Sequence, residues 1–422
     1  MSDRSLSRIA RAPFRPLPRR AVQLGLAANA LRPVPGGPAS VPAMFGGWLT
    51  AELAPQWLAL TAADLAHEVV RGRSRGRDRA LALGMSAASA AAYVSMIRTS
   101  RRAGAAVEDA LVETLGAGYR EPIAREARPD DPLSWQNIAR FRMRHPDVTR
   151  VRRLAYAPGG RRYELDVYHH RGQPGGRPVL LQVHGGGWTI GNKEEQGQPL
   201  MNHMAARGWV CVAVNYPLSP KARWPEHLIA LKRAVQWIRE NGATYGADPS
   251  FIAVTGGSAG GHLAAMLALT ADDPSLQPGF ERVDTSIQSC VPHYGMYDWT
   301  ADTGLKHTQQ RIDALFRPVV MPRGASYPDD YRAASPLYRV REDAPPFLVI
   351  HGANDTLIPV GDARTFVARL REVSKNPVAY AELPGTQHAF DIFPSIRSAQ
   401  VVRGVEQFLE WSYATRSAPS AQ

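Results

Sequence analysis

A serine set among glycines follows directly after an apolar run. Residues 250–261 read SFIAVTGGSAGG, so Ser258 lies between a strand-like segment and the helix-forming segment HLAAMLAL. This G-x-S-x-G pattern is typical of a nucleophile elbow, in which glycines remove the Cβ atoms that a sharp strand-to-helix turn cannot hold. The pattern predicts that Ser258 is a nucleophile, and the alternative is an ordinary glycine-rich connection.

A serine hydroxyl needs a base beside it and a carboxylate that orients the base. The strand-like run PPFLVIHG is followed by ANDTLIP, which contains Asp355, and PVAYAELP is followed by GTQHAF, which contains His388. Serine, acid and histidine then stand in the chain order of hydrolases that use a nucleophile elbow. We therefore predict a triad of Ser258, Asp355 and His388.

Other acids and histidines compete for these two roles. Asp298 also follows a strand-like run and is the alternative acid, whereas Asp362 falls within a predicted helix. His262 lies four residues after Ser258 on one predicted helix, where it is too constrained to reach the serine Oγ, so we interpret it as a packed or surface residue. His351 ends a strand-like run beside the site and is interpreted as structural.

Three consecutive glycines, Gly185 to Gly187, end another apolar run in the stretch VLLQVHGGGWTIGN. A phosphate-binding P-loop requires Lys followed by Ser or Thr, and a dinucleotide fingerprint requires a glycine where Ile190 stands, so neither is favoured. An HGGG loop instead supplies backbone N–H groups to an oxyanion, together with the residue after the nucleophile, Ala259. The pattern leaves open which glycines donate.

With HGGGW, GGSAGG, HGANDTLIP and GTQHAF in this order, the chain resembles the hormone-sensitive-lipase-like α/β-hydrolase esterases and lipases, especially the longer actinobacterial members. The resemblance covers about residues 130–413. It implies Ser258 as nucleophile, His388 as general base and then acid, and Asp355 as the residue that orients His388. It also implies an oxyanion hole and its support, which are Gly186, Gly187 and Ala259 as donors and His184 and Gly185 as loop residues.

Two positions depart from the pattern of that family. The chain reads NYPLSPK where many members read DYRLAPE, so Asn215 and Pro217 replace an aspartate and an arginine. It reads HAF where many members read HGF, which places Ala389 after the predicted base. Neither change removes a reacting group, so the expected reaction class is unaffected.

The elements that must position these residues alternate as in an α/β protein. Strand-like runs are expected at 161–170, 177–185, 209–216, 250–256, 287–295, 345–352 and 377–384, with helices at 225–242, 259–271, 361–374 and 395–413. This alternation predicts a mostly parallel sheet covered by helices on both faces, in which ligands bind at the carboxyl ends of the strands. Together with the resemblance, it predicts an α/β-hydrolase fold with a helical cap.

Three segments are expected along the chain. Residues 1–43 hold seven prolines, seven arginines and one acidic residue, which favours a poorly ordered basic segment. Residues 44–118 are rich in Ala and Leu and predict a helical region, and residues 119–415 form the hydrolase domain. The cap is expected from helices within about 100–145 and an insertion at about 299–336, whose Phe316, Tyr327 and Tyr331 either line an acyl pocket or pack in the core.

The net charge of +12 is unevenly spread. Residues 1–150 carry 22 of the 50 Lys and Arg and 13 of the 38 Asp and Glu, a net +9, which leaves +3 for the rest of the chain. No nucleic-acid partner is therefore expected for the hydrolase domain. Cys211 and Cys290 lie inside apolar runs and are interpreted as buried hydrophobic residues, and neither a metal nor a cofactor is expected.

Residues 80–97 form an uncharged stretch of 18 residues that is rich in Ala and Ser. These residues insert weakly into lipid, so a buried or membrane-surface helix is favoured over a span. No convincing signal peptide precedes it. We expect a bacterial protein that is cytoplasmic or associated with the membrane or cell envelope, with peripheral membrane association through the N-terminal region; the oligomeric state is left open.

The motifs predict a serine hydrolase that cleaves small-molecule or lipid carboxylic esters through an acyl-enzyme intermediate. One alternative is an amide or formamide hydrolase of the same fold, because HGGxW with SAGxH also occurs in arylformamidases. The alternative from another class is an inactive, membrane-tethered binding protein on a hydrolase fold.

Overall fold

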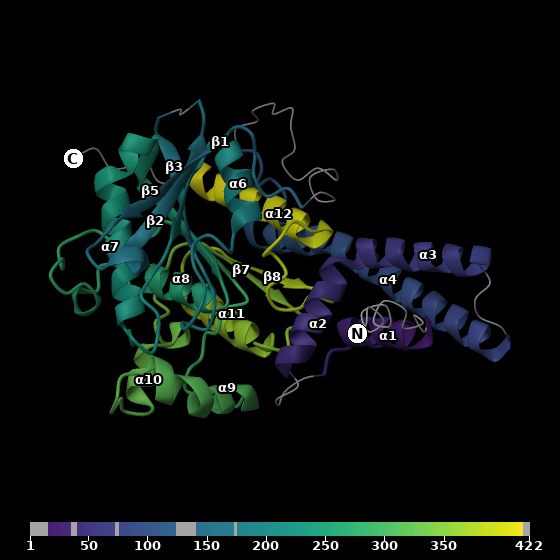
Figure 1. The fold of residues 1–422 in the computed structure, drawn as a ribbon. Coiled ribbons are helices and arrows are strands. Elements are labelled where there is room, and N and C mark those ends of the chain that lie inside the picture. Colours follow the sequence, from purple (N-terminus) through teal and green to yellow (C-terminus); the bar gives the residue numbers. More distant parts are fainter. Residues whose placement is uncertain (1–15, 35–39, 72–75, 124–140, 173–174, 417–422) are drawn as a thin grey trace, which may run out of the picture. The chain divides into compact units, whose positions relative to one another are not determined.

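A computed structural model describes residues 16–34, 40–71, 76–123, 141–172 and 175–416 (Figure 1). The chain folds into two compact units, Met1–Thr99 and Ser100–Gln422. The division falls inside the long helix α4 (Gly76–Leu115). Each unit has its own buried apolar cluster.

The first unit is helical throughout its described part. It contains α1 (Pro16–Leu31), α2 (Ser40–Glu52), α3 (Ala54–Arg71) and the first turns of α4. Its buried cluster is built mainly from small residues, which let the helices approach closely, and from Tyr93, whose ring stacks on Trp57 with centroids 6.4 Å apart. Three helices lie in the segment 44–118, where the sequence predicted a helical region.

Helix α1 differs from the expectation of a poorly ordered segment over residues 1–43. The stretch PLPRRAVQLGLAANAL holds both its prolines in the first turn, where a missing N–H costs no helical hydrogen bond, and strong helix formers follow. The prediction therefore weighed the prolines too heavily. Residues 1–15 and 35–39, which the same prediction covered, lie outside the described residues.

The second unit contains an eight-stranded sheet within the described residues, with the order β1-β2-β4-β3-β5-β6-β7-β8. Strands β3 to β8 run parallel, whereas β2 is antiparallel to both β1 and β4. The mostly parallel sheet predicted from the sequence is confirmed. The strand bounds are β1 Val148–Ala155, β2 Glu164–His170, β3 Arg177–Val183, β4 Val210–Val214, β5 Ala247–Gly257, β6 Ser289–His293, β7 Phe347–Gly352 and β8 Val378–Leu383.

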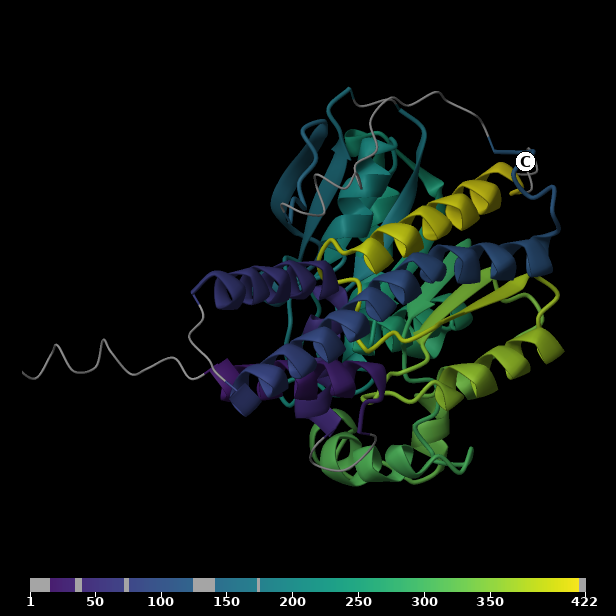
Figure 2. The same cartoon turned by 90° about the vertical axis from the view of Figure 1, so that its right-hand side faces the viewer.

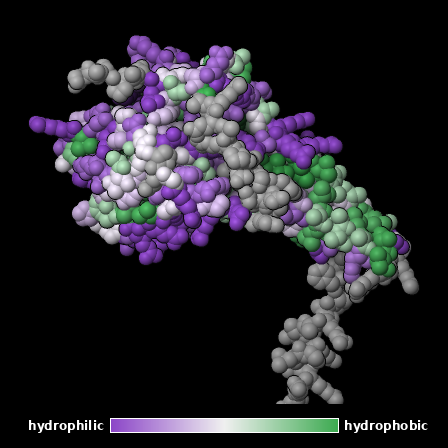
Figure 3. Space-filling view, turned by 90° about the horizontal axis from the view of Figure 1, so that it is seen from above, coloured by the Kyte–Doolittle hydropathy of each residue, from purple (hydrophilic) through white to green (hydrophobic). Residues whose placement is uncertain are grey.

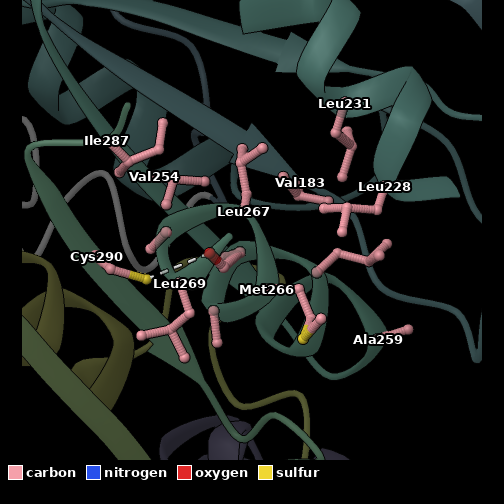
Figure 4. Close-up of a cluster of buried hydrophobic side chains, with 14 of the residues drawn as sticks. Val183, Leu228, Leu231, Val254, Ala259, Met266, Leu267, Leu269, Ile287 and Cys290 are labelled. Atoms are coloured by element: carbon pink, nitrogen blue, oxygen red, sulfur yellow. Dashed lines mark hydrogen bonds between the residues drawn. The ribbon is translucent and has the colours of Figure 1, made fainter. Parts of the chain in front are cut away.

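Side chains along the central strands alternate between two apolar layers. On β3, Leu181 faces one layer and Leu180 the other, and the same alternation holds on β4, β5 and β7. Helices α7 (Glu226–Asn241), α8 (Ala259–Leu269) and α11 (Gly361–Val373) cover the first face. Figure 4 shows side chains of α7 and α8 beside those of the strands. Helices α6 (Gln198–Ala206) and α12 (Ile396–Ala414) cover the second face together with the last turns of α4 (Figure 2). Helices on both faces were predicted and are confirmed.

The last turns of α4 belong to the second unit. Val107 packs so closely on α12 that a Cβ on Gly404 would lie 2.3 Å from its side chain, and the Tyr119 hydroxyl donates to Gln407 of α12 at 2.6 Å. The second unit therefore begins near Ser100, before the boundary at residue 119 that we expected from the sequence.

The insertion between β6 and β7 is largely helical. It contains α9 (Lys306–Arg311), a π-helix η5 (Ile312–Val320) and α10 (Asp329–Ala333), and it falls within the predicted cap insertion at 299–336. Of the other predicted cap helices, within about 100–145, residues 124–140 lie outside the described residues. Phe316 and Tyr331 are fully buried, so they pack in the core, while Tyr327 is half-exposed.

The surface differs between the two units. Large apolar side chains are exposed on α1 to α3, among them Val22 at 62% and Val70 at 82%, and Figure 3 shows hydrophobic atoms gathered over these N-terminal helices. In the described part of the chain, α4 is the one helix long and apolar enough to cross a bilayer, a test that core helices of soluble proteins also pass. Cys211 and Cys290 are both buried and unpaired, as predicted.

Candidate active site

Ser258 lies at the end of β5 and caps the first turn of α8. Its backbone has φ 59° and ψ −123°, a conformation that residues with a Cβ rarely adopt. The Ser258 N–H donates to the carbonyl of His293 at 3.0 Å, and the Ser258 carbonyl accepts from His262 N–H. These backbone bonds hold the strained turn, so the geometry is that of a nucleophile elbow.

The glycines around Ser258 are required by close backbone contacts. A Cβ on Gly256 would lie 2.6 Å from the Val183 carbonyl oxygen of β3, and one on Gly260 would lie 2.2 Å from the same atom. Contacts this short cannot be relieved by moving a flexible side chain. The elbow can therefore pack against β3 only if both positions lack a side chain.

Asp355 and His388 meet from neighbouring loops at the carboxyl ends of β7 and β8. His388 Nδ1 lies 2.7 Å from Asp355 Oδ2, and both side chains are buried. The other carboxylate oxygen of Asp355 accepts from the N–H groups of Leu357 and Ile358, each at 2.8 Å. The carboxylate is thus fixed on one side by its own loop and bonds to His388 on the other.

A second histidine contacts the same carboxylate. His351 Nε2 lies 3.4 Å from Asp355 Oδ2 and 2.7 Å from the Ile358 carbonyl oxygen. Burial raises the pKa of Asp355, but the charge interaction with His388 and the hydrogen bond from His351 outweigh burial and hold the pKa well below its ordinary value. Asp355 is therefore ionised at neutral pH and can orient His388 through its Nδ1–H.

Gln387 joins the two loops that carry Asp355 and His388. Its side-chain oxygen accepts from Thr356 N–H at 2.9 Å and from His388 N–H at 2.9 Å. The two loops are therefore connected through their backbones as well as through the Asp355–His388 bond.

Ser258 and His388 are brought to the same edge of the sheet without a direct hydrogen bond between the described side chains. Tyr294, the residue after β6, contacts His388 and the elbow: its ring centroid is 4.6 Å from that of His388, and a Cβ on Gly257 would lie 2.5 Å from its hydroxyl.

The loop after β3 brings three glycines beside the elbow. A Cβ on Gly185 would lie 3.2 Å from the Ser258 Cβ. The Gly185 N–H donates to the side chain of Gln196 at 2.7 Å, whereas Gly186 N–H, Gly187 N–H and Ala259 N–H find no acceptor among the described residues. Of the three glycines, Gly186 and Gly187 are thus the ones whose N–H groups remain available to a bound ligand.

His184 supports this loop. Its Nδ1 lies 2.7 Å from the Gly185 carbonyl oxygen, and its ring stacks on Tyr216 with centroids 4.3 Å apart. Burial lowers the pKa of His184 to about 4, so the ring is neutral at pH 7 and its Nδ1–H donates to that carbonyl. It has no contact with Ser258 that would allow it to act as a base.

Aromatic side chains of the insertion pack on the residue that follows the three glycines. Trp188 is buried, has φ 60°, and lies 4.8 Å from Trp299 and 5.7 Å from Phe316, measured between ring centroids. Trp299 in turn stacks on His262 at 4.5 Å. The insertion therefore fixes the glycine loop from one side, and His262 is a packed residue, as interpreted from the sequence.

Asp298 does not reach His388. Its Oδ1 accepts from the Thr300 N–H and hydroxyl, each at 2.7 Å, and its Oδ2 accepts from the Thr303 hydroxyl at 2.7 Å. These contacts make Asp298 an organiser of its own loop.

The second competing acid, Asp362, is buried on α11 and accepts from Tyr297 N–H at 2.8 Å through Oδ2. Its Oδ1 is buried and has no hydrogen-bond partner among the described residues. It therefore has no contact with His388 either.

The two departures from the family pattern are accommodated locally. The Asn215 side chain accepts from Lys193 N–H at 2.8 Å and donates to the Arg161 carbonyl at 2.9 Å, so neutral hydrogen bonds hold this turn. Ala389 has φ 62°, a conformation that a glycine adopts without strain.

Asp362 provides a prediction about stability. Burial raises its pKa to about 7. The protonated acid is favoured in the folded state, so folding is penalised as pH rises above the ordinary value of 3.8, and the penalty levels off above pH 7. Asp362→Asn cannot ionise, so we expect its unfolding free energy relative to wild type to rise by about 2–3 kcal/mol between about pH 5 and pH 8. Denaturant unfolding at both pH values measures this, and a difference that does not vary with pH would contradict it.

Several residues of this site were not identified from the sequence. They are His351 as a contact of Asp355, Gln387, Gln196, Trp188, Tyr294 and Asp391. A signal was available for three of them, because the quoted motifs contain His351, Gln387 and Trp188. In the described part of the chain, no group of three or more His, Cys, Asp or Glu side chains is arranged to hold a metal ion.

Comparison with known sequences found similarity over nearly the whole chain. The BD-FAE family model matches residues 165–370. The chain is 42% identical to the probable carboxylic ester hydrolase LipM of Mycobacterium tuberculosis, over 95% of this chain and 94% of that protein. It is 38% identical to the esterase LipQ of the same organism, over 90% and 87% of the two chains.

Comparison with solved structures supports the fold. A truncated carbohydrate esterase from gut microbiota matches with a TM-score of 0.52 and 22% identity, over 63% of this chain and 98% of that one. Esterase Est2 of Thermogutta terrifontis matches with a TM-score of 0.52 and 21% identity, over 67% and 96%.

Proposed function

The chain belongs to the hormone-sensitive lipase family of α/β-hydrolases and is a carboxylic ester hydrolase, and from this premise we propose that it works through an acyl-enzyme formed on Ser258. The observation that carries the proposal is the strained Ser258 elbow beside a glycine loop with free N–H groups. The buried pair of Asp355 and His388 at the same sheet edge supplies the acid and the base.

In the proposed acylation, His388 Nε2 accepts the hydroxyl proton of Ser258 while the serine Oγ bonds to the ester carbonyl carbon. Asp355 accepts from His388 Nδ1–H, which keeps Nε2 free to take the proton and stabilises the imidazolium that forms. The tetrahedral intermediate then expels the alcohol, which takes its proton from His388. The acyl group remains on Ser258.

Deacylation repeats these steps with water. His388 takes a proton from a water molecule, the hydroxide bonds to the acyl carbon, and the serine oxygen leaves with the proton from His388. The acid product is released and Ser258 is restored.

The oxyanion of both tetrahedral intermediates would accept from Gly186 N–H, Gly187 N–H and Ala259 N–H. These groups have no acceptor among the described residues, and Ala259 N–H lies at the positive end of α8. The bond from Gly185 N–H to Gln196 supports this choice among the three glycines.

Two glycine variants test the oxyanion loop. Gly186 and Gly187 have φ 118° and 57°, so alanine is strained at both, but a Cβ on Gly186 would lie 2.2 Å from the Ile190 carbonyl oxygen and one on Gly187 has only a contact at 3.9 Å. We expect Gly186→Ala to displace the loop and lower kcat about 10²-fold to 10³-fold, the cost of a lost oxyanion donor. Gly187→Ala should lower kcat by a clearly smaller factor. Equal losses in steady-state kinetics would contradict this interpretation of the loop.

The substrate class is tested with p-nitrophenyl esters from acetate to palmitate. Hydrolysis by the wild-type chain, with none by Ser258→Ala, is the expected result. The acyl chain with the highest kcat/KM distinguishes an esterase for short chains from a lipase. A chain that hydrolyses no ester of the series would overturn the proposal.

Similar assays distinguish ester hydrolysis from the two alternative functions, amide or formamide hydrolysis and binding without catalysis. An amide or formamide hydrolase would show a higher kcat/KM for an anilide or formanilide than for the matched ester. An inactive binding protein would neither turn over these substrates nor label with a fluorophosphonate. The names of the relatives favour ester hydrolysis over both.

We further propose that the first unit binds an anionic lipid surface and so presents lipid esters to the enzyme. Exposed apolar side chains on α1 to α3 (Figure 3) and the net charge of +8 of residues 1–99 support it. The full chain should co-sediment with phosphatidylglycerol vesicles. The double variant Phe45→Ser, Val70→Ser should bind the vesicles more weakly, whereas Val112→Ser in the second unit should bind them as the full chain does. Equal binding by all three would contradict the proposal.

A further inference from the structure

A partly buried carboxylate, Asp391, stands three residues after His388 and anchors the loop that carries this histidine. Asp391 accepts from the Tyr294 hydroxyl through one oxygen and pairs with His293 Nδ1 at 2.7 Å through the other. Both partners stand at the carboxyl end of β6. Phe390 fills the space above them, with its ring centroid 6.1 Å from His293 and 5.6 Å from Tyr294.

The same two residues, His293 at the end of β6 and Tyr294 directly after it, also contact the elbow. The His293 carbonyl accepts from Ser258 N–H at 3.0 Å, and the Tyr294 ring and hydroxyl lie where a Cβ on Gly257 would stand. His293 contacts the Ser258 backbone and Tyr294 contacts Gly257, and both residues bond to Asp391. A chain of contacts connects Ser258 to the His388 loop although their side chains share no hydrogen bond.

Tyr294 contacts His388 directly and is held in a strained backbone conformation. Its φ is 37°, its N–H donates to the Ile350 carbonyl at 2.7 Å, and its ring lies against the His388 imidazole at 4.6 Å. Ala389, next to His388, has φ 62°. Strain of this kind persists only where surrounding contacts over-determine the backbone, and it is often found at functional sites.

Both groups are in the protonation states that the contact requires. Burial and the neighbouring Asp391 raise the pKa of Tyr294 well above its ordinary value, so its hydroxyl keeps the proton that it donates. Burial raises the pKa of Asp391, but the hydrogen bond and charge interaction with His293 and the hydrogen bond from Tyr294 together outweigh burial and hold the pKa below its ordinary value. Asp391 is therefore an ionised acceptor for both bonds.

We propose that Tyr294 and Asp391 are positioning residues that hold His388 at the correct distance from Ser258. The Tyr294 ring packs against the His388 imidazole. The bonds from Tyr294 and His293 to Asp391 hold both the tyrosine and the His388 loop against the end of β6. Neither residue touches the reacting atoms. This inference rests on the proposed function, because it assigns a distance that matters only if His388 exchanges a proton with Ser258.

Tyr294→Phe is the sharpest variant, because it keeps the ring against His388 and removes only the bond to Asp391. Asp391→Ala removes both bonds. Asp391→Asn keeps an oxygen that accepts from Tyr294 and serves as the conservative variant. Tyr297→Phe is the matched control, since Tyr297 is equally buried on the same segment and its hydroxyl makes no hydrogen bond of good geometry.

The measurement is kcat per active site, with the sites counted by complete reaction with a p-nitrophenyl phosphonate. We expect Asp391→Ala to lower kcat per site about 10²-fold, with Tyr294→Phe falling at least about tenfold and KM nearly unchanged, because displacements of about 1 Å in a reacting pair have effects of this size. The kcat per site of Asp391→Asn should lie within about tenfold of the wild-type value. Tyr297→Phe should match wild type.

A purely structural role would give a different result. It would lower the fraction of sites that react with the phosphonate, while the sites that do react would turn over at the wild-type rate. That outcome for Tyr294→Phe overturns the proposal even if Asp391→Ala fails to fold. If the wild-type chain hydrolyses no ester and takes up phosphonate no better than Ser258→Ala, the proposed function fails instead.

Discussion

Ser258→Ala is expected to lower kcat for a chromogenic ester by at least about 10⁴-fold, because no other described side chain lies in the elbow to attack the carbonyl. The variant should fold as wild type does. Ser258 makes no capping hydrogen bond through its side chain, and alanine carries the same Cβ and the same strain at φ 59°. Steady-state kinetics and thermal unfolding of the same preparation measure both effects.

Two companion variants make the Ser258 result specific. Ser258→Gly should also be inactive, yet it should be more stable than Ser258→Ala by about 1 kcal/mol, because glycine adopts positive φ without strain. Ser289→Ala removes a buried hydroxyl on β6 that has no hydrogen-bond partner, so it should keep full activity. Activity retained by Ser258→Ala would assign the nucleophile to another residue.

Asp355→Asn is expected to lower kcat about 10³-fold to 10⁴-fold with little change in KM. The Asp355 carboxylate accepts from His388 Nδ1–H at 2.7 Å, and an amide that presents its NH₂ there would favour the tautomer in which Nε2 carries the proton. His388 could then no longer accept the proton of Ser258. Loss of the same kind of orienting carboxylate has an effect of this size in serine proteases.

Asp298→Asn is the matched control for Asp355→Asn. Its carboxylate bonds only to Thr300 and Thr303 among the described residues, so kcat should stay within about tenfold of wild type. A larger loss for Asp298→Asn than for Asp355→Asn would show that the wrong carboxylate was chosen.

The pKa of Asp355 sets the pH range over which the orienting contact persists. Because this pKa is lower in the folded state, the ionised carboxylate stabilises the fold above its ordinary value of 3.8, and this contribution is lost as pH falls through the lowered value. At neutral pH the wild-type contact is therefore complete. The effect of Asp355→Asn should be measured there.

The family and the reaction class were predictable because they depend on short, contiguous patterns. The turn around Ser258 needs its glycines locally, and the comparisons confirm the family that the four motifs predicted. Seven of the eight described strands were also expected from their apolar runs. Strand β1 was missed because VTRVRRLA is half exposed and carries three arginines, and α6 was missed because its nine residues are too few to show a helical period.

What the sequence determined by itself is the order and local setting of Ser258, Asp355 and His388, because a parallel sheet brings the residues that follow its strands to one edge. The tertiary structure decided which residues support them. That Gln387 binds the Thr356 N–H across 31 residues, and that Asp391 reaches Tyr294 across 97 residues, depends on contacts between distant segments. No periodicity or spacing in one sequence encodes such contacts, because they arise only when the packed layers bring the loops together.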